Sequence, residues 1–303
     1  MTPPYWFLST RAHSVGGPVG PVKVLRSDLP GYSGDLTGAL VDAIRGREIF
    51  FVVHGFNVNQ NDGLQHLGYW MDNLQIGNAI PIGILWPGDC IVPIFLDYVV
   101  EGHEAIHSGK ELAKFLNDQL SVAASVCFAS HSLGARVVLQ TISGLSLGIR
   151  VRRTVLMAGA LDDTCLTNEY KNAANRVEEI SLLASKKDDV LSMAYPAGNF
   201  LQGIIDRGHP YWHAALGREG PAQPYPPPPQ LQLEWMIPDP LNYGHLDYIP
   251  GAAIAAQYPS AVEIPPDGGP CPPDGTPALL ADPGAKWKPG FSAGFVSTRY
   301  QRP

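Results

Sequence analysis

The chain alternates short apolar runs with segments whose apolar residues recur at helical spacing. Apolar residues recur every three or four positions over 105–120 and again over 133–145, as in helices that lay one face on a sheet. Apolar runs of strand length lie at 49–53, 80–86, 122–129, 154–158 and 177–184. Strands that alternate with helices predict a mainly parallel sheet, so the predicted fold class is α/β.

The two ends of the chain depart from this alternation. Apolar runs at residues 6–8 and 22–25 predict two edge strands, where an antiparallel start to a mixed sheet is common. Toward the C-terminus the pattern gives way to proline-rich stretches. We therefore expect a single domain over residues 1–303, with an irregular proline-rich loop near 218–230 and a proline-rich tail over 251–303.

Composition and charge argue against two kinds of partner. The formal net charge is -7, and no cluster of Lys and Arg offers a track for phosphates, so we expect no nucleic-acid partner. No run of about 18 apolar residues indicates a membrane span. The N-terminus lacks the basic and apolar regions of a signal peptide, which slightly favours a cytoplasmic location. The sequence carries no signal of oligomeric state.

Cysteines and histidines give no strong metal site. The four cysteines show neither CxxC nor zinc-like spacing, so we expect buried or free thiols, while a disulfide between Cys165 and Cys271 stays open. Residues 103–107 read H-E-x-x-H, a literal match to the zinc motif of metalloproteases. Two histidines near the start of a surface helix also explain it, and no third ligand is evident. We expect no metal or cofactor and keep a zinc-dependent hydrolase as a minor alternative.

Two serines lie in patterns typical of a nucleophile, and their surroundings differ. Ser132 stands in S-H-S-L-G, directly after the buried run 126–129 and directly before an amphipathic helix. A nucleophile elbow needs small residues two before and two after the serine, because its sharp turn brings backbones close together. Ser130 and Gly134 meet that need. The start of a helix also favours developing negative charge, so this context favours Ser132.

Ser146 stands in a literal G-x-S-x-G but in the opposite context. It follows a helix instead of preceding one, and Gly144 or Gly148 is expected to end that helix in the left-handed conformation. Such patterns recur by chance in a chain of this length, so the motif alone is weak evidence. We therefore predict that Ser132 is the nucleophile.

Two motifs carry a resemblance to the α/β-hydrolase fold family. A strand at 50–53 runs into H-G-F at 54–56, which resembles the family's oxyanion loop, and A-S-H-S-L-G-A resembles its nucleophile elbow. The resemblance covers about residues 47–250. More narrowly, F-L-S-T-R near residue 7, V-V-H-G-F-N, L-W-P-G-D at 85–89 and a late G-H-L-D-Y resemble a poorly characterised bacterial branch that is known mainly by its fold.

The resemblance implies a mostly parallel central sheet with helices on both faces. It also implies an oxyanion hole made of the backbone amides of Phe56 and Leu133, with His54 in a structural role within its own loop. Dehalogenases and epoxide hydrolases of this fold need an aspartate at the elbow, so the serine disfavours them. Only a short link, about 161–168, follows the strand before the expected acid strand, so we expect no large cap there.

A serine hydroxyl needs a histidine to take its proton and an acid to hold that histidine's tautomer. In this fold the histidine comes last in the chain, and His209, His213 and His245 follow the serine before the tail. His245 lies in G-H-L-D-Y, which resembles the late histidine loop of the branch. We predict that His245 is the base, while His209 and His213 could line a substrate pocket or pack under the tail.

The acid is a choice among four aspartates. The family places its acid just after the penultimate strand as D-x-V, and the run 177–184 is followed by K-K-D-D-V, which favours Asp188 over Asp189. Asp162 and Asp163 follow the strand before it, where some hydrolases carry the acid. A solvated loop charge or a helix N-cap is the plain alternative for all four.

Together these residues predict a serine hydrolase that cleaves small-molecule carboxylic esters through an acyl-enzyme. Ser132 attacks, His245 carries the proton and Asp188 orients the histidine, while amide and thioester cleavage stay open. A non-catalytic or scaffold protein on a hydrolase fold is the alternative, because fold does not determine function. The complete set of serine, acid and histidine argues against that alternative.

Overall fold

The structure is a computed structural model of the chain. It describes residues 4–13, 18–29, 34–72, 74–76, 78–89, 94–192, 213–222, 227–231, 236–237, 239, 242–248 and 278–279. Most of the proline-rich tail predicted over 251–303 lies outside these residues, and so does part of the loop predicted near 218–230.

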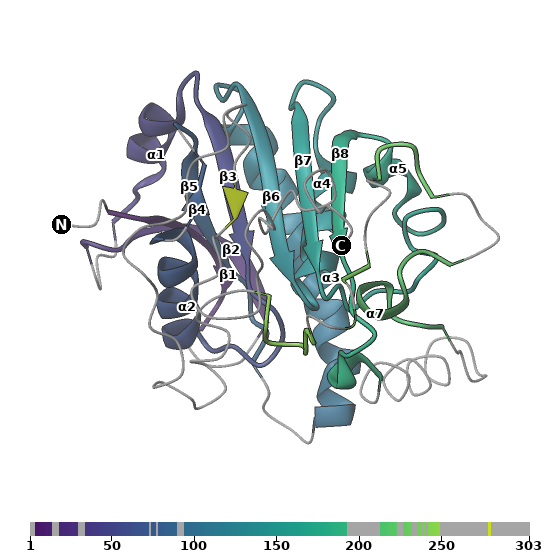
Figure 1. Cartoon of the computed structure of the whole chain (residues 1–303). Coiled ribbons are helices and arrows are strands. Elements are labelled where there is room, and N and C mark those ends of the chain that lie inside the picture. Colours follow the sequence, from purple (N-terminus) through teal and green to yellow (C-terminus); the bar gives the residue numbers. More distant parts are fainter. Residues whose placement is uncertain are drawn as a thin grey trace.

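Seven strands form one sheet in the order β2-β1-β5-β3-β6-β7-β8 (Figure 1). The strands are β1 (Trp6–Arg11), β2 (Val19–Arg26), β3 (Glu48–Val53), β5 (Ile80–Leu85), β6 (Ser125–His131), β7 (Val151–Met157) and β8 (Val177–Leu183). β1 and β2 pair antiparallel, and all other neighbouring pairs are parallel, which confirms the predicted sheet. The prediction that residues 6–8 form an edge strand was wrong: β1 also pairs with β5, and its six residues are all buried.

Helices join the parallel strands and cover both faces of the sheet. α2 (Gln60–Asp72) leads from β3 outward to β5, whereas α3 (Ile94–Gln119) and α4 (Gly134–Gly144) lead in the opposite direction, to β6 and β7. Because such crossovers are right-handed, α2 covers one face while α3 and α4 pack together on the other (Figure 1). The remaining elements are α1 (Thr37–Ile44), α5 (Lys171–Ala174), α7 (Leu216–Glu219) and a small second sheet of β4 (Leu74–Gln75) with β9 (Ala278–Leu279).

The connection from β7 to β8 is short. It runs over residues 158–176, all of which are described, and α5 with its four residues is its one helix. No large cap is therefore inserted at this point, as the sequence predicts.

The central strands are continuous apolar runs because helices cover both faces of the sheet. Every residue of β6 is buried, and so is all of β3 except its first residue. Phe51 and Phe128 stack across these two neighbouring strands with their ring centroids 5.1 Å apart. Close packing of this kind makes the sheet a rigid base for the loops at its carboxyl edge.

α4 ends without the glycine cap that the sequence suggests. Neither Gly144 nor Gly148 is among the described glycines with positive φ, so the prediction of a left-handed cap was wrong. The helix ends where Leu145 turns extended, with φ -67 and ψ 148. Gly144 is instead required by packing, because a Cβ there would lie 2.7 Å from the Cβ of Ala113 in α3.

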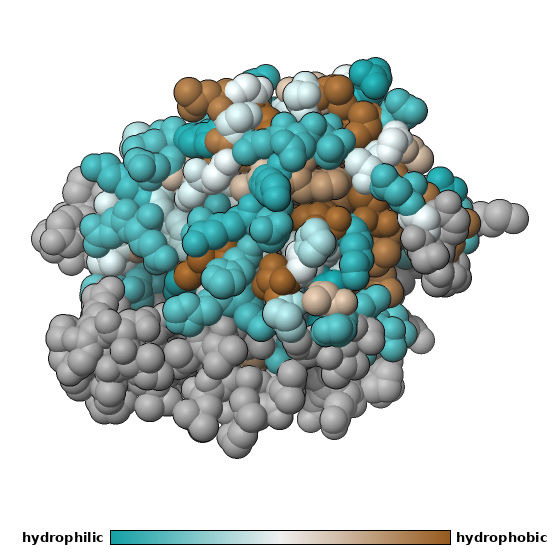
Figure 2. Space-filling view, turned by 180° about the vertical axis from the view of Figure 1, so that it is seen from behind, coloured by the Kyte–Doolittle hydropathy of each residue, from teal (hydrophilic) through white to brown (hydrophobic). Residues whose placement is uncertain are grey.

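The face opposite to that of Figure 1 mixes polar and apolar side chains. Figure 2 shows hydrophilic residues across its middle and left and apolar residues gathering toward its right side. Among the described residues, the exposed large apolar side chains are those of Leu29, Leu147, Val190 and Leu246. Within the same part of the chain, none of the helices has the length and apolar character needed to cross a membrane.

Candidate active site

Ser132 lies on the turn between β6 and α4. Its φ is 52°, in the left-handed region that residues other than glycine rarely adopt. The Ser132 N–H donates to the Met157 carbonyl at 2.9 Å. Its carbonyl accepts from the N–H groups of Ala135 at 3.1 Å and Ala160 at 3.2 Å. The sequence of strand, strained turn and helix is therefore present, and neighbouring backbone holds the strain in place.

The glycines near Ser132 are required by close backbone packing. A Cβ on Gly134 would overlap the carbonyl oxygen of His54. A Cβ on Gly55 would lie 3.0 Å from the Cβ of Ser132. The start of α4 and the serine therefore pack directly against the H-G-F loop that follows β3.

The two residues suggested for an oxyanion hole adjoin the serine from different segments. Leu133 follows Ser132 at the start of α4 and is 1% exposed. Phe56 follows Gly55, whose backbone packs against Ser132. Both residues thus belong to segments that adjoin Ser132.

The side chains of Ser132, His245 and Asp188 form a continuous hydrogen-bonded chain. His245 Nε2 lies 2.9 Å from Ser132 Oγ, and His245 Nδ1 lies 2.7 Å from Asp188 Oδ2. The Asp188 carboxylate is fully buried, and the His245 side chain is 10% exposed. Because a carboxylate accepts the Nδ1–H, the Nε2 lone pair is available for the serine proton. This geometry suits proton transfer from the serine hydroxyl to the histidine.

The loop that carries Asp188 is held by several hydrogen bonds. Asp188 Oδ1 accepts from the Leu191 N–H at 2.9 Å. Arg218 Nη1 donates to the main-chain carbonyls of Asp188 at 2.9 Å and Lys186 at 2.7 Å. Asp189 is exposed, so the structure brings Asp188 and not its neighbour to His245. The sequence did not predict the contacts of Arg218, because no motif connects it with a loop 30 residues away.

The loop that carries His245 is closed on itself and tied to the acid loop. The Gly244 N–H donates to Asp247 Oδ2 at 2.7 Å, which explains the aspartate in G-H-L-D-Y. Ser185 Oγ donates to the Tyr243 carbonyl at 2.7 Å. The histidine therefore sits on a turn whose two sides are both fastened.

His131, the residue before the serine, contacts the histidine loop. Its Nε2–H donates to the main-chain carbonyl of His245 at 2.7 Å, and the two ring centroids lie 4.8 Å apart. Burial, and then the positive charge of His245, lower the pKa of His131 to about 3. The ring is therefore neutral at physiological pH and does not oppose a positive charge on His245. The sequence did not predict this contact, although His131 directly precedes Ser132 in S-H-S-L-G.

His54 is built into its own loop, as expected. Its Nδ1–H donates to the Gly55 carbonyl at 2.8 Å, and its Nε2 accepts from the Trp86 backbone N–H at 3.3 Å. The Trp86 indole N–H donates back to the His54 carbonyl at 2.9 Å. Burial, followed by the charge of Arg11, lowers the pKa of His54 to about 3. A neutral histidine with both ring nitrogens engaged has a structural role.

Asp163 and His213, the alternative candidates for the acid and the base, contact each other. His213 Nδ1 lies 3.0 Å from Asp163 Oδ1. Asp162 forms an isolated backbone bridge with Ala215. Asp163 therefore serves neither as a helix cap nor as the partner of His245, and His209 lies outside the described residues.

Ser146 lies at the other end of α4 from Ser132. It is exposed, and its N–H donates to Asn117 Oδ1 at 2.7 Å. The eleven residues of α4 separate the two serines by roughly 16 Å along the helix axis. Ser146 is thus remote from the chain of Asp188, His245 and Ser132.

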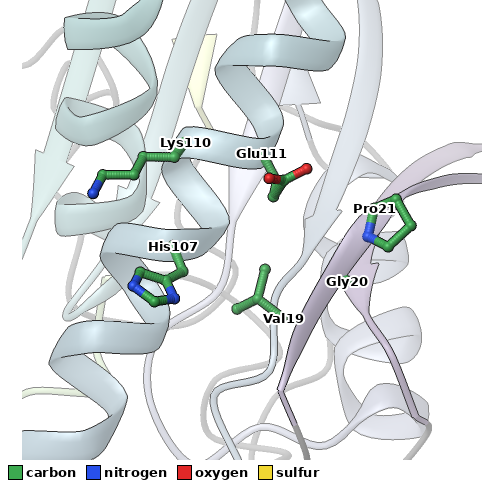
Figure 3. A pocket seen from close by; sticks show the side chains of 6 residues that line it. All are labelled: Val19, Gly20, Pro21, His107, Lys110 and Glu111. Atoms are coloured by element: carbon green, nitrogen blue, oxygen red, sulfur yellow. The ribbon is translucent and has the colours of Figure 1, made fainter.

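A pocket of about 400 Å³ lies between β2 and α3, and Figure 3 shows the residues that line it, His107, Lys110 and Glu111 of α3 and Val19, Gly20 and Pro21 of β2. The H-E-x-x-H motif contributes only His107 to the lining, and His103 and His107 are both exposed. Within the described part of the chain, no three side chains of His, Cys, Asp or Glu are grouped so that they could hold a metal ion. The motif therefore gains no third ligand from that part of the chain.

The two described cysteines are buried free thiols, Cys127 and Cys165. Burial raises the pKa of Cys127 to about 12 and that of Cys165 well above its usual value. Cys165 is therefore not in the disulfide with Cys271 that the sequence left possible, and Cys271 itself lies outside the described residues.

Below pH 6.5 the free energy of unfolding should fall as the pH is lowered, because two buried histidines resist protonation in the folded chain. The pKa values of His54 and His131 are lowered from 6.5 to about 3. Between pH 6.5 and about pH 3 the unfolded chain binds more protons than the folded chain. The free energy of unfolding therefore falls by up to about 1.4 kcal/mol per pH unit for each histidine. Urea unfolding at pH 7 and pH 5 measures the difference. A His103→Gln variant, altered at an exposed site, should show the same dependence, and equal stability at both pH values contradicts the prediction.

Comparisons with known proteins give a matching family and a similar solved structure. The sequence model of the family described as "Alpha/beta hydrolase of unknown function (DUF900)" matches residues 37–210, more than half of the chain. No curated protein matches the sequence. A crystal structure of an uncharacterized protein from Bacillus cereus ATCC 10987 is similar, with 16% sequence identity and a TM-score of 0.38. The similarity covers 70% of this chain and 58% of that one, so the chain spans less than two thirds of the length of that protein.

Proposed function

Because the chain belongs to the alpha/beta hydrolases of unknown function (DUF900), we propose that it is a serine hydrolase that cleaves carboxylic esters through an acyl-enzyme. One observation carries the proposal. Ser132 Oγ, both ring nitrogens of His245 and Asp188 Oδ2 lie in one chain with steps of 2.9 and 2.7 Å. The left-handed φ of Ser132 supports it, since such strain is typical of a nucleophile elbow.

Acylation begins with attack of Ser132 Oγ on the ester carbonyl carbon. The hydroxyl proton moves to His245 Nε2, and Asp188 keeps the proton on Nδ1 and stabilises the imidazolium. The carbonyl oxygen becomes an oxyanion, which the backbone N–H groups of Phe56 and Leu133 stabilise. The tetrahedral intermediate then collapses, the C–O bond to the alcohol breaks, and the alcohol leaves with the proton from Nε2.

Deacylation repeats these steps with water. Nε2 removes a proton from a water molecule, which attacks the acyl carbon, and the intermediate releases the carboxylic acid while Ser132 recovers its proton. The ring of His131 lies 4.8 Å from that of His245 and is neutral, so it does not repel the positive charge that His245 carries in both steps. Amides and thioesters can follow the same route, so a panel of p-nitrophenyl esters, anilides and thioesters is needed to rank them.

The test is labelling with a fluorophosphonate, followed by peptide mass spectrometry. The phosphonate should attach to Ser132, because only an activated serine attacks phosphorus at a useful rate. The adduct should disappear in Ser132→Ala and persist in Ser146→Ala, the control in the literal G-x-S-x-G. Wild-type protein that is folded but carries no adduct overturns the proposal and favours a non-catalytic protein on this fold.

A further inference from the structure

Three sequence motifs meet at one buried ion pair that has no part in the proposed chemistry. Arg11 is the last residue of F-L-S-T-R and of β1, and Asp89 is the last residue of L-W-P-G-D after β5. Arg11 Nη1 pairs with Asp89 Oδ1, and Arg11 Nη2 donates to the main-chain carbonyl of Val58. Val58 directly follows V-V-H-G-F-N, and Arg11 and Asp89 are only 2% and 5% exposed. Arg11 therefore ties two other motifs together below the surface.

These contacts fasten the loop over 54–58 at both ends. At its start, His54 is held by the ring and backbone of Trp86. At its end, the Val58 N–H donates to the Gly88 carbonyl at 3.1 Å, and the Val58 carbonyl accepts from Arg11. Phe56, whose amide we assign to the oxyanion hole, lies between the two fastened ends.

The loop needs such support because its backbone is strained. Asn57 has a φ of 60°, the left-handed conformation that costs free energy for residues other than glycine. Strained residues keep their conformation only where the surroundings determine it. Arg11 comes from β1 and Asp89 follows β5, and β1, β5 and β3 are adjacent in the sheet, so both partners stand on a rigid frame.

Stability alone does not account for an ion pair in this place. Removing two charges from water is costly, and well-packed apolar residues often replace a buried pair without loss of stability. Arg11 Nε is buried and has no hydrogen-bond partner among the described residues, so the guanidinium is not fully satisfied. An apolar pair, however, could not donate a hydrogen bond to the Val58 carbonyl, and the Arg11 guanidinium does so and thereby fixes the direction of that carbonyl.

We infer that Arg11 and Asp89 are positioning residues that hold the loop over 54–58 in the shape in which the Phe56 amide meets the developing oxyanion. Arg11 makes the contact to the loop. Asp89 orients Arg11 and balances its charge, next to the Gly88 carbonyl that holds the Val58 N–H. The inference rests on the proposed serine hydrolase.

The test uses the double variant Arg11→Met/Asp89→Leu. A single replacement would leave one buried charge unpaired and could prevent folding, whereas the double variant removes both charges and keeps similar volume. The matched control is Arg153→Met/Glu179→Leu. It removes a partly buried ion pair of 3.3 Å between β7 and β8, near the beginnings of these strands and away from the loops at their ends.

The double variant should fold and bind p-nitrophenyl acetate with little change in KM, while kcat falls by about 10²- to 10³-fold, the usual loss for an oxyanion donor. The inhibition constant of a trifluoromethyl ketone should rise in parallel, because its adduct with serine places an oxyanion in the same hole. Hydrogen exchange of the amides over 54–58 should become faster. The control variant should match the wild type in all three measurements.

A folded double variant with unchanged kcat and unchanged hydrogen exchange of the amides over 54–58 overturns the inference. A rise in KM alone also overturns it, because that result indicates a contact to substrate. Failure of the proposed function has a different signature, namely wild-type protein that takes no fluorophosphonate. In that case the exchange rates of the double variant still decide whether the ion pair holds the loop.

Discussion

An Asp188→Asn variant is expected to keep its fold and to lose about four orders of magnitude in kcat toward p-nitrophenyl acetate. The buried side chain keeps an oxygen for the Leu191 N–H, so the loop retains its contact. The amide NH₂, however, cannot accept a hydrogen bond from His245 Nδ1–H. The histidine then adopts the other tautomer, with the proton on Nε2, and can no longer accept the proton of Ser132. Steady-state kinetics and thermal unfolding of the same sample measure the two effects.

The matched control is Asp163→Asn, since Asp163 also carries a carboxylate hydrogen-bonded to a histidine. Its partner is His213, which has no part in the proposed proton transfer, so kcat should change by no more than a few-fold. The reverse result, with activity lost in Asp163→Asn and kept in Asp188→Asn, would assign the acid to the loop after β7.

A Gly217→Ala variant is expected to lose about 4 kcal/mol or more of its free energy of unfolding, the range of exceptional single mutations. A Cβ on Gly217 would overlap the backbone of Ala158 and Gly159, lying 2.6 Å from the Cα of Ala158. Backbone cannot move aside as a side chain can. The Gly217 carbonyl also accepts from the Ser185 N–H at 3.0 Å, at the start of the acid loop, so the surviving folded protein should lose activity as well. Urea unfolding and kcat measure the two losses.

Gly148→Ala is the control for that experiment. Nothing lies within 4 Å of a Cβ at Gly148, which is exposed, so its stability should stay within about 0.5 kcal/mol of the wild type. A Gly217→Ala variant with wild-type stability and activity would contradict the close packing of α7 against the turn after β7.

Local patterns predicted much of the fold. The apolar runs and the helical spacing predicted the α/β class and the positions of β3, β5, β6, β7 and β8, because burial between helices leaves an apolar run in each of these strands. The position of β1 was predicted wrongly, because its order in the sheet depends on β5, about 75 residues away. The function of Gly144 was missed for a similar reason, since the residue that it contacts belongs to another helix.

For the site, the sequence by itself determined the turn around Ser132 and the loop around His54, because strand, small residues and helix follow each other directly in the chain. Tertiary structure alone decided which of four aspartates meets His245, since Asp188 lies 57 residues from it. It also decided the contacts of His131, Arg218, Gly217 and Arg11, which join segments that leave no joint pattern in the sequence. Such contacts arise only when the carboxyl ends of the parallel strands are brought to one edge of the sheet.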